Sequence, residues 1–228
     1  MTNNSKTVKS GAPATLTAIW GLVIAFGWPL LSLIPGLSSR QLTDIRGDLK
    51  NVCLKWLVVG VLCLIAFAAQ QWKPSGFGIR WVGWRDFLAA FAGFVIALVS
   101  AGAASVLVAV PSSLSDVGKL ASIPLGVRIV VVLTAAICEE FIYRGFSIEE
   151  VAYLTGKRWL AGAISLVIFT AAHLRLYGIS AALVIPASVG AVLTGLYLWR
   201  RNLLSCMLVH ALMDGLFLLV LPTLTHLA

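Results

Sequence analysis

The stretch Cys-Glu-Glu-Phe-Ile-Tyr-Arg-Gly, residues 138–145, lies at the end of an apolar run that extends from Val127 to Gly145. Three of its side chains are charged at neutral pH in water: Glu139, Glu140 and Arg144. In the hydrocarbon core of a bilayer, such a residue costs about 2.5–3.5 kcal/mol on insertion scales and is by default a candidate for function. Whether this run crosses a membrane therefore decides the fold class, and it also decides whether these residues are candidates for function.

The composition of the whole chain is that of a membrane protein. Of its 228 residues, 60% are hydrophobic and only 11% are charged, whereas about 25% of the residues of a soluble domain are charged. A helix needs about 20 mostly apolar residues to cross a bilayer, so the chain has room for about seven or eight spans. The net charge of +8 fits basic loops at an anionic membrane surface. No basic-aromatic pattern indicates a nucleic-acid partner.

The apolar runs predict an all-α protein, a polytopic transmembrane helical bundle of seven spans. We expect a polar N-terminal tail, residues 1–15, and a single transmembrane domain over residues 16–228. The first apolar run is predicted to be a retained span rather than a signal peptide. An eighth span follows if the stretch Ser112–Ile123 folds into the membrane. The runs are Leu16–Leu37, Val52–Gln70, Phe87–Val110, Val127–Gly145, Trp159–His173, Ile179–Trp199 and Leu203–Leu224.

Three loops combine Trp with Lys or Arg, a mixture typical of the membrane–water interface. They are Gln71–Asp86, Lys157–Trp159 and Trp199–Arg201. In a seven-span arrangement these loops lie on one side together with the N-terminus. We expect this to be the cytoplasmic side of a bacterial inner membrane, with the active-site cavity opening toward it, although basic residues in the opposing first loop, among them Arg40 and Arg46, weaken the rule.

Helical spacing separates the two glutamates. Glu140 and Arg144 are four residues apart with the acid nearer the N-terminus, which is the favourable order for an ion pair. Glu139 points about 100° away around the helix. Arg144 can therefore hold one carboxylate ionised while Glu139 is free for proton transfer. A purely structural ion pair between Glu140 and Arg144 is the alternative.

Two histidines are predicted to meet these carboxylates. His173 ends the fifth run, and the seventh run holds His210 four residues before Asp214. Residues 155–158 indicate a turn between the fourth and fifth helices, which places Glu139 and His173 each about 21–23 Å from that turn. In an antiparallel hairpin Glu139 and His173 lie at the same depth in the membrane. The helix that carries His210 begins on the same side of the membrane as this turn. The first three runs hold almost no comparable residues.

This set of side chains indicates hydrolysis inside the membrane. A carboxylate and an imidazole can share a water and remove its proton as it attacks a carbonyl, and a second His with an Asp or Asn can donate to the oxyanion. Two His and a Glu are also a zinc ligand set, and Glu/His chains serve proton-coupled transporters. The chain lacks a His-Glu-x-x-His pair, which argues against a zinc site. The ionisable residues within the spans lie in one half of the chain, which argues against a transporter. Cys206, near His210, is a weaker candidate for a nucleophile.

The ionisable residues form three motifs that resemble those of the CAAX-protease and bacteriocin-processing family, also called the Abi family, whose eukaryotic branch includes the Ras-converting CAAX endopeptidase. The motifs are Glu139-Glu140-x-x-x-Arg144, Phe169-x-x-x-His173 and His210-x-x-x-Asp214, in this order and each in an apolar run. The resemblance covers about residues 127–217, which we take as the catalytic core. It implies a glutamate-dependent intramembrane endopeptidase that needs no metal or other cofactor.

The resemblance also implies a role for each residue by motif position. Glu139 would be the general base, His173 its partner on the attacking water, and His210 with Asp214 the oxyanion site. The family has Asn or Asp at the last position. Because an ionised Asp cannot donate to an oxyanion, Asp214 either carries a proton or orients His210.

The remaining implications concern Glu140, Arg144 and the substrate. By resemblance, Glu140 and Arg144 have a structural or substrate-positioning role. The expected partners are a peptide or protein substrate at the membrane, with or without a lipid group, and the membrane lipids. A non-proteolytic scaffold or a bacteriocin-immunity protein, which binds peptides without cutting them, is an alternative that membership of such a family does not exclude.

Overall fold

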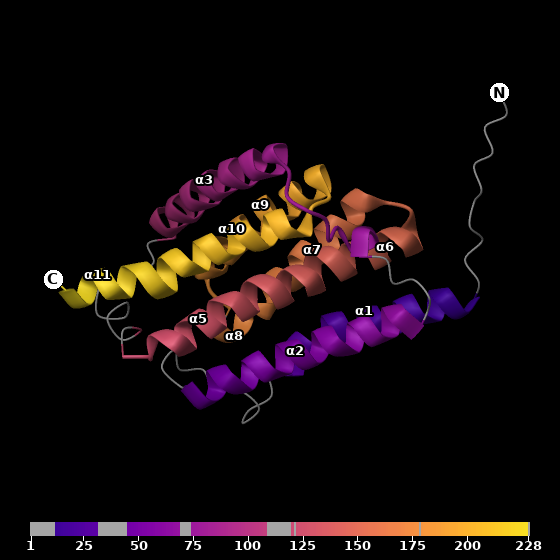
Figure 1. Ribbon diagram of the computed structural model, residues 1–228, viewed down its shortest axis with the longest axis horizontal. Helices are drawn as coiled ribbons and strands as arrows, with labels where there is room; N and C mark the ends of the chain where they lie inside the picture. Colours follow the sequence, from indigo (N-terminus) through magenta and orange to yellow (C-terminus); the bar gives the residue numbers. More distant parts are fainter. Residues whose placement is uncertain are drawn as a thin grey trace.

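The computed structural model of the chain describes residues 12–31, 45–68, 74–108, 120, 122–177 and 179–227. Over these residues the chain is almost entirely helical and contains no β-strand. The helices pack into an elongated bundle (Figure 1). The predicted all-α class is therefore confirmed.

Seven helical spans can be followed through the described residues, the number that the sequence predicts. The spans are α1 (Ala12–Leu31), α2 (Ile45–Ala68), α3 (Trp84–Leu107), a long helix from Leu125 to Thr155, α7 (Arg158–Ala172), α9 (Val184–Arg200), and α10 (Leu203–Gly215) continued by η5 (Leu216–Val220) and α11 (Leu221–Leu227). Short helices connect them: η1 (Pro74–Phe77), α8 (Leu174–Tyr177) and η4 (Ala181–Leu183). The stretch Ser112–Ile123, which would supply an eighth span, lies mostly outside the described residues.

The outer surface of the bundle is apolar. On α2, for example, Leu57, Leu64 and Phe67 are 64%, 69% and 70% exposed. A soluble monomer rarely shows contiguous apolar surface of this kind. Four of the described helices are also long and apolar enough to cross a membrane: α2, α3, α9 together with η4, and the helix that begins with α10. The chain is thus an integral membrane protein.

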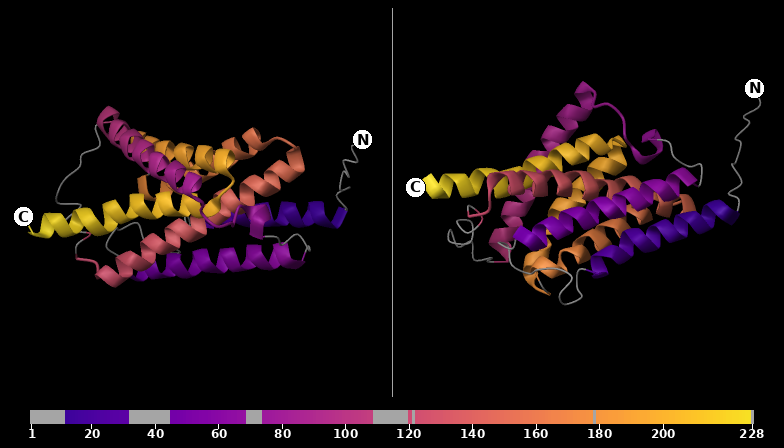
Figure 2. Two further views of the ribbon diagram at one scale, coloured as in Figure 1. Left: turned by 45° about the horizontal axis from the view of Figure 1, so that its top comes forward. Right: turned by 60° about the horizontal axis from the view of Figure 1, so that its bottom comes forward.

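The helices are arranged in two groups around the long fourth helix. Figure 2 shows α1 and α2 along one flank, and α3, α9 and α10 along the other. Contacts join α1 to α2, α2 to the start of the fourth helix, and α3 to both α9 and α10. The fourth helix and α10 also contact each other, so side chains from both flanks can meet on it.

The fourth helix changes its winding in the middle. It begins as α5 (Leu125–Thr134), continues as π-helix in η2 (Ala135–Glu139) and η3 (Phe141–Ser147), and ends as α6 (Ile148–Thr155). π-Helical turns are rare and occur frequently at functional sites. The sequence analysis treats this stretch as a regular α-helix with 100° between neighbours, and that expectation is wrong here. Within this stretch the buried hydroxyl of Ser147 donates to the carbonyl oxygen of Ile142, five residues earlier, at 2.6 Å.

The predicted turn between the fourth and fifth spans is confirmed. The fourth helix ends at Thr155, Gly156 adopts a left-handed conformation with φ of 69°, and α7 begins at Arg158. Glycine takes this conformation without the clash that a Cβ would cause, which makes it a common helix stop. The helices that carry Glu139 and His173 therefore form an antiparallel pair.

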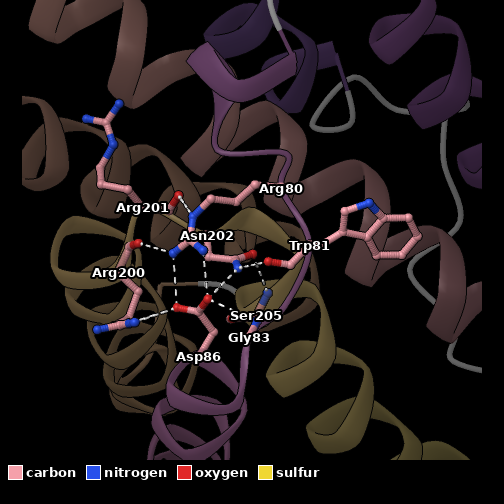
Figure 3. Close-up of polar contacts among 8 residues, drawn as sticks. All are labelled: Arg80, Trp81, Gly83, Asp86, Arg200, Arg201, Asn202 and Ser205. Carbon is pink, nitrogen blue, oxygen red and sulfur yellow. Dashed lines mark hydrogen bonds and ion pairs between the residues drawn. The ribbon is translucent and has the colours of Figure 1, made fainter.

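Two of the three predicted interface loops meet at Asp86 (Figure 3). Arg80 donates to both carboxylate oxygens of Asp86 at 2.7 and 3.0 Å, and Arg200 donates at 2.9 Å. Asn202 donates to Asp86 at 3.2 Å and also caps α10 by accepting from the backbone N–H of Ser205. The buried Asp86 thus fixes the start of the helix that carries His210.

The third interface loop joins the same end of the bundle through Glu149 on α6. Tyr197 donates to Glu149 at 2.8 Å, Arg201 at 2.9 Å and Arg158 at 3.2 Å. The turn after α6 is therefore tied to the turn after α9. The clusters around Asp86 and Glu149 both agree with the expectation that these basic loops lie on one side of the bundle.

Replacing Asp86 with alanine tests whether this cluster stabilises the fold. The substitution removes the common acceptor of two arginines that are partly exposed, and we expect a loss of about 2 kcal/mol. The thermal midpoint of the detergent-solubilised protein should fall by about 4–8 °C. Arg85→Ala, which removes the exposed neighbouring charge, is the matched control and should leave the midpoint unchanged. Equal midpoints for both variants would show that the cluster does not anchor α10.

Candidate active site

The predicted ion pair between Glu140 and Arg144 is present and fully buried. Nη1 of Arg144 donates to Oε1 of Glu140 at 2.8 Å, and both side chains are 0% exposed. Nη2 of Arg144 donates to the carbonyl oxygen of Gly190 on α9 at 3.3 Å. The pair therefore links the fourth helix to α9 at the centre of the bundle.

Phe169 packs against this pair and both histidines. The Arg144 guanidinium lies 4.2 Å from the centroid of its ring, and the rings of His173 and His210 lie 4.7 and 6.5 Å from it. A Cβ at position 190 would come within 2.8 Å of the same ring. Gly190 thus allows α9 to approach α7 closely.

His210 lies between two carboxylates. Its Nδ1 is 2.7 Å from Oε1 of Glu140, and its Nε2 is 3.4 Å from Oδ2 of Asp214. The second distance is longer than a usual N–H···O bond of about 2.7–3.2 Å, and the Asp214 side chain is 32% exposed. The Nδ1 side of the ring is therefore held by a short hydrogen bond to Glu140. Nε2 has only the longer contact to Asp214, which it can give up for another hydrogen-bond partner. The contact between His210 and Glu140 was not predicted from the sequence.

His173 stands where α7 ends. Its Nδ1 lies 2.8 Å from the carbonyl oxygen of Phe169, one of the last carbonyls of the helix, which lack partners within it. Because a carbonyl can only accept, Nδ1 carries the hydrogen, and in the neutral ring Nε2 is the basic nitrogen. The ring also stacks on Tyr177 of α8, with 6.4 Å between centroids. These contacts fix both the tautomer and the orientation of the imidazole.

Glu139 points to a different neighbour from Glu140. Nζ of Lys55 on α2 lies 2.6 Å from Oε1 of Glu139, with 17% and 13% of the two side chains exposed. Glu139 also lies within electrostatic range of His173 and His210. The structure thus gathers the predicted acid and both predicted histidines from three different spans.

Lys55 is the site residue that the sequence analysis missed. It lies inside the predicted second span, and the first three spans were read as almost free of ionisable residues. A lysine within an apolar run was a signal in itself, because ionisable residues within spans usually face the bundle interior and find a partner there. Glu139, which is expected to be free for proton transfer, thus has an ion-pair partner of its own.

No three His, Cys, Asp or Glu side chains gather to form a candidate metal site in the part of the chain that the structure describes. The carboxylates face Lys55, Arg144 and His210 instead. The site as built is a network of ion pairs with two imidazoles.

The four cysteines are free thiols, and the two beside the site are buried. Cys206 is 0% exposed, and its Sγ lies 3.7 Å from the carbonyl oxygen of Leu193. Such a thiol has neither the exposure nor the electropositive surroundings of a reactive cysteine. Of the other two thiols, Cys53 is exposed and Cys63 is partly exposed, because both lie on the lipid-facing α2.

Comparison with known proteins identifies the segment that contains these residues. Residues 121–216 match the family model described as type II CAAX prenyl endopeptidase Rce1-like. The matched segment includes Glu139, His173, His210 and Asp214, and it does not extend to Lys55. No curated protein and no solved structure matches the chain.

The buried pair of Glu140 and Arg144 makes a prediction about stability. Glu140→Met leaves the Arg144 guanidinium without a counter-charge in the core and should cost about 3–5 kcal/mol. Arg144→Met should cost less, because Glu140 keeps His210 as a partner. The double variant leaves no such charge, so its loss of stability should be smaller than the sum of the two single losses. Unfolding of the wild type and the three variants in detergent measures this cycle. Strictly additive losses would show that the two side chains do not interact.

Proposed function

We propose that the chain, whose residues 121–216 match the Rce1-like model of type II CAAX prenyl endopeptidases, is an intramembrane endopeptidase. It would hydrolyse peptide bonds with a water activated by Glu139 and His173, without a metal ion. The observation that carries the proposal is that the rings of His173 and His210, 4.7 and 6.5 Å from that of Phe169, meet within electrostatic range of Glu139 inside the matched segment. The proposed substrate is a membrane-associated or lipidated peptide.

The first step is activation of water. Oε1 of Glu139 accepts from Lys55, so Oε2 is the oxygen that we assign to the attacking water. Nε2 of His173, the basic nitrogen, accepts the second hydrogen bond and aligns the water. As the water oxygen bonds to the carbonyl carbon, its proton passes to Glu139, and the electron pair of the C=O bond moves to the oxygen. A base placed in this way accelerates such a step by about 10²–10⁴-fold.

The second requirement is a donor for the oxyanion. Glu140 holds Nδ1 of His210, and Nε2 faces the more exposed Asp214. A protonated Nε2 can exchange this long contact for a hydrogen bond to the oxyanion, which strengthens as charge develops. In this scheme Asp214 orients His210 and need not donate, which resolves how the site works with Asp at this position. Glu140 and Arg144 act through His210 and do not touch the substrate.

The reaction ends when the intermediate collapses. The carbonyl re-forms, the C–N bond breaks, and the proton held by Glu139 passes to the leaving amine. The products are a new amine and a new carboxylic acid, which keeps the second hydrogen of the water and passes it to the amine to become a carboxylate, and Glu139 returns to its ionised state. Every proton taken from the water is thus accounted for, and no group other than the side chains named and water is required.

Access to the site is proposed from the end of the bundle that carries the basic loops. Asp86 and Glu149 gather arginines there, and α6, α7, α9 and α10 begin or end at this level. By the rule that basic loops lie inside, this end faces the cytoplasm, and a bacterial inner membrane is the proposed location.

Cleavage of fluorogenic peptides tests the proposal. The detergent-purified wild type should cut members of a peptide library, part of it lipidated, both with and without a chelator. Glu139→Gln and His173→Ala should each lower kcat by about 10²–10⁴-fold. Glu150→Gln, the same exchange on the same long helix but outside the site, is the matched control and should keep wild-type activity.

Each other outcome favours a different function. Loss of cleavage with the chelator would move the assignment to a zinc-dependent protease. Absence of cleavage by the folded wild type across a broad library would favour a scaffold or immunity protein that binds peptides without cutting them. Full activity in Glu139→Gln would contradict the assigned base.

Asp214 provides a separate prediction, about orientation rather than chemistry. Asp214→Asn keeps an oxygen that can accept from Nε2 of His210, so its kcat should stay within about tenfold of the wild type. Asp214→Ala removes that acceptor and should lower kcat by about 10–100-fold at unchanged KM. Steady-state kinetics of both variants measures the difference. Equal losses for Asn and Ala would show that the negative charge, and not the acceptor, is what the site needs.

A further inference from the structure

The two adjacent glutamates each have a cation of their own. Arg144 binds Glu140 from the same helix at 2.8 Å, and Lys55 binds Glu139 from α2 at 2.6 Å. The first pair lies within the segment that matches the endopeptidase family, whereas Lys55 lies far outside it. The family match does not extend to this lysine, and the proposed mechanism uses it only as the partner that occupies Oε1 of Glu139.

The position of Lys55 is fixed by its own helix. The neighbouring Trp56 donates from its indole N–H to Oγ1 of Thr134 at 3.1 Å. Thr134 and Glu139 are the residues at the two ends of the first π-helical turn, and hydrogen bonds from i to i+5 bring residues five apart toward the same face. The wider winding thus presents Thr134 and Glu139 together to α2. Two polar contacts hold Lys55 against the carboxylate.

Lys55 is the permanent positive charge beside Glu139. The other titratable groups within electrostatic range of this carboxylate are His173 from the end of α7, His210 from α10, and Tyr143 and the neighbouring Cys138 from the fourth helix. Asp214 of α10 also lies within electrostatic range of Lys55. In a poorly hydrated site, a carboxylate without a cation takes up a proton rather than stay charged. A protonated Glu139 cannot accept a proton from water.

We propose that Lys55 is a positioning residue for the hydrolytic reaction: it binds Oε1 of Glu139, keeps this carboxylate in its basic form and directs Oε2 toward the water shared with His173. The inference rests on the proposed function. Lys55 acts through Glu139 and does not touch the substrate. The site therefore extends to α2, beyond the three motif-bearing spans.

A lysine that merely joined two helices would give a different result from a lysine that tunes the base. Loss of a structural contact lowers activity equally at every pH, together with stability. Loss of the charge that holds Glu139 ionised moves the acidic limb of the pH–rate profile, because more alkaline solution is then needed to deprotonate the base. An opposite charge at this distance changes such a limb by about 1–3 pH units.

The test is the pH dependence of kcat/KM for Lys55→Met, Lys55→Gln and Lys55→Arg, with thermal midpoints measured in the same detergent. We expect the acidic limb of the Met and Gln variants to move by about 1–3 pH units toward alkaline pH. The Arg variant, which keeps the charge, should restore the wild-type limb. Lys50→Met, the same exchange at an exposed position of α2, is the matched control and should behave as the wild type.

The possible failures can be told apart. A wild-type acidic limb in a folded Met or Gln variant would overturn the assignment of Lys55 while leaving the endopeptidase intact. Failure of Lys55→Arg to restore the limb would overturn it as well, because the charge would then not be the property that matters. Absence of cleavage by the wild type would instead refute the proposed function, and the inference with it.

Discussion

An ionised side chain inside a bilayer needs a partner of opposite charge, and this constraint organises the centre of the protein. Glu140 is bound by Arg144 and His210, and Glu139 by Lys55. These contacts join the fourth span to α2 and α10, and Arg144 adds α9 through the carbonyl of Gly190. Buried ion pairs are weak evidence for net stability, since removing charges from water costs several kcal/mol per ion. Their value here is that they fix which helices meet and how two carboxylates are oriented.

The two carboxylates are neighbours in the chain but have different surroundings. Glu140 is fully enclosed, and its Oε1 accepts from both Arg144 and His210. Glu139 is 13% exposed, is held by Lys55 on one oxygen, and lies in electrostatic range of both imidazoles. Two chemically identical carboxylates can have different roles in one site when their surroundings differ. In the proposed mechanism Glu140 builds the oxyanion donor and Glu139 moves the proton.

Local features of the site could be predicted from the sequence, and tertiary ones could not. Hydropathy located the spans, Gly156 located the turn, and the four-residue spacing of Glu140 and Arg144 predicted their ion pair. The pairing of His210 with Glu140 depends on which helices adjoin, which no spacing along one helix contains. The π-helical winding of residues 135–147 depends on buried contacts, and Lys55 was overlooked because its partner is 84 residues away in the chain. A search for any charge inside an apolar run would have found it.

The central claim is that Glu139 removes a proton from water and does not itself attack the peptide bond. A single-turnover cleavage in water enriched in oxygen-18, with excess enzyme and mass spectrometry of the new carboxyl group, tests it most directly. Attack by activated water predicts that the heavy isotope enters the product in the first turnover. A first-turnover product without the heavy isotope would mean that the oxygen came from the enzyme, and Glu139 would then be a nucleophile rather than a base.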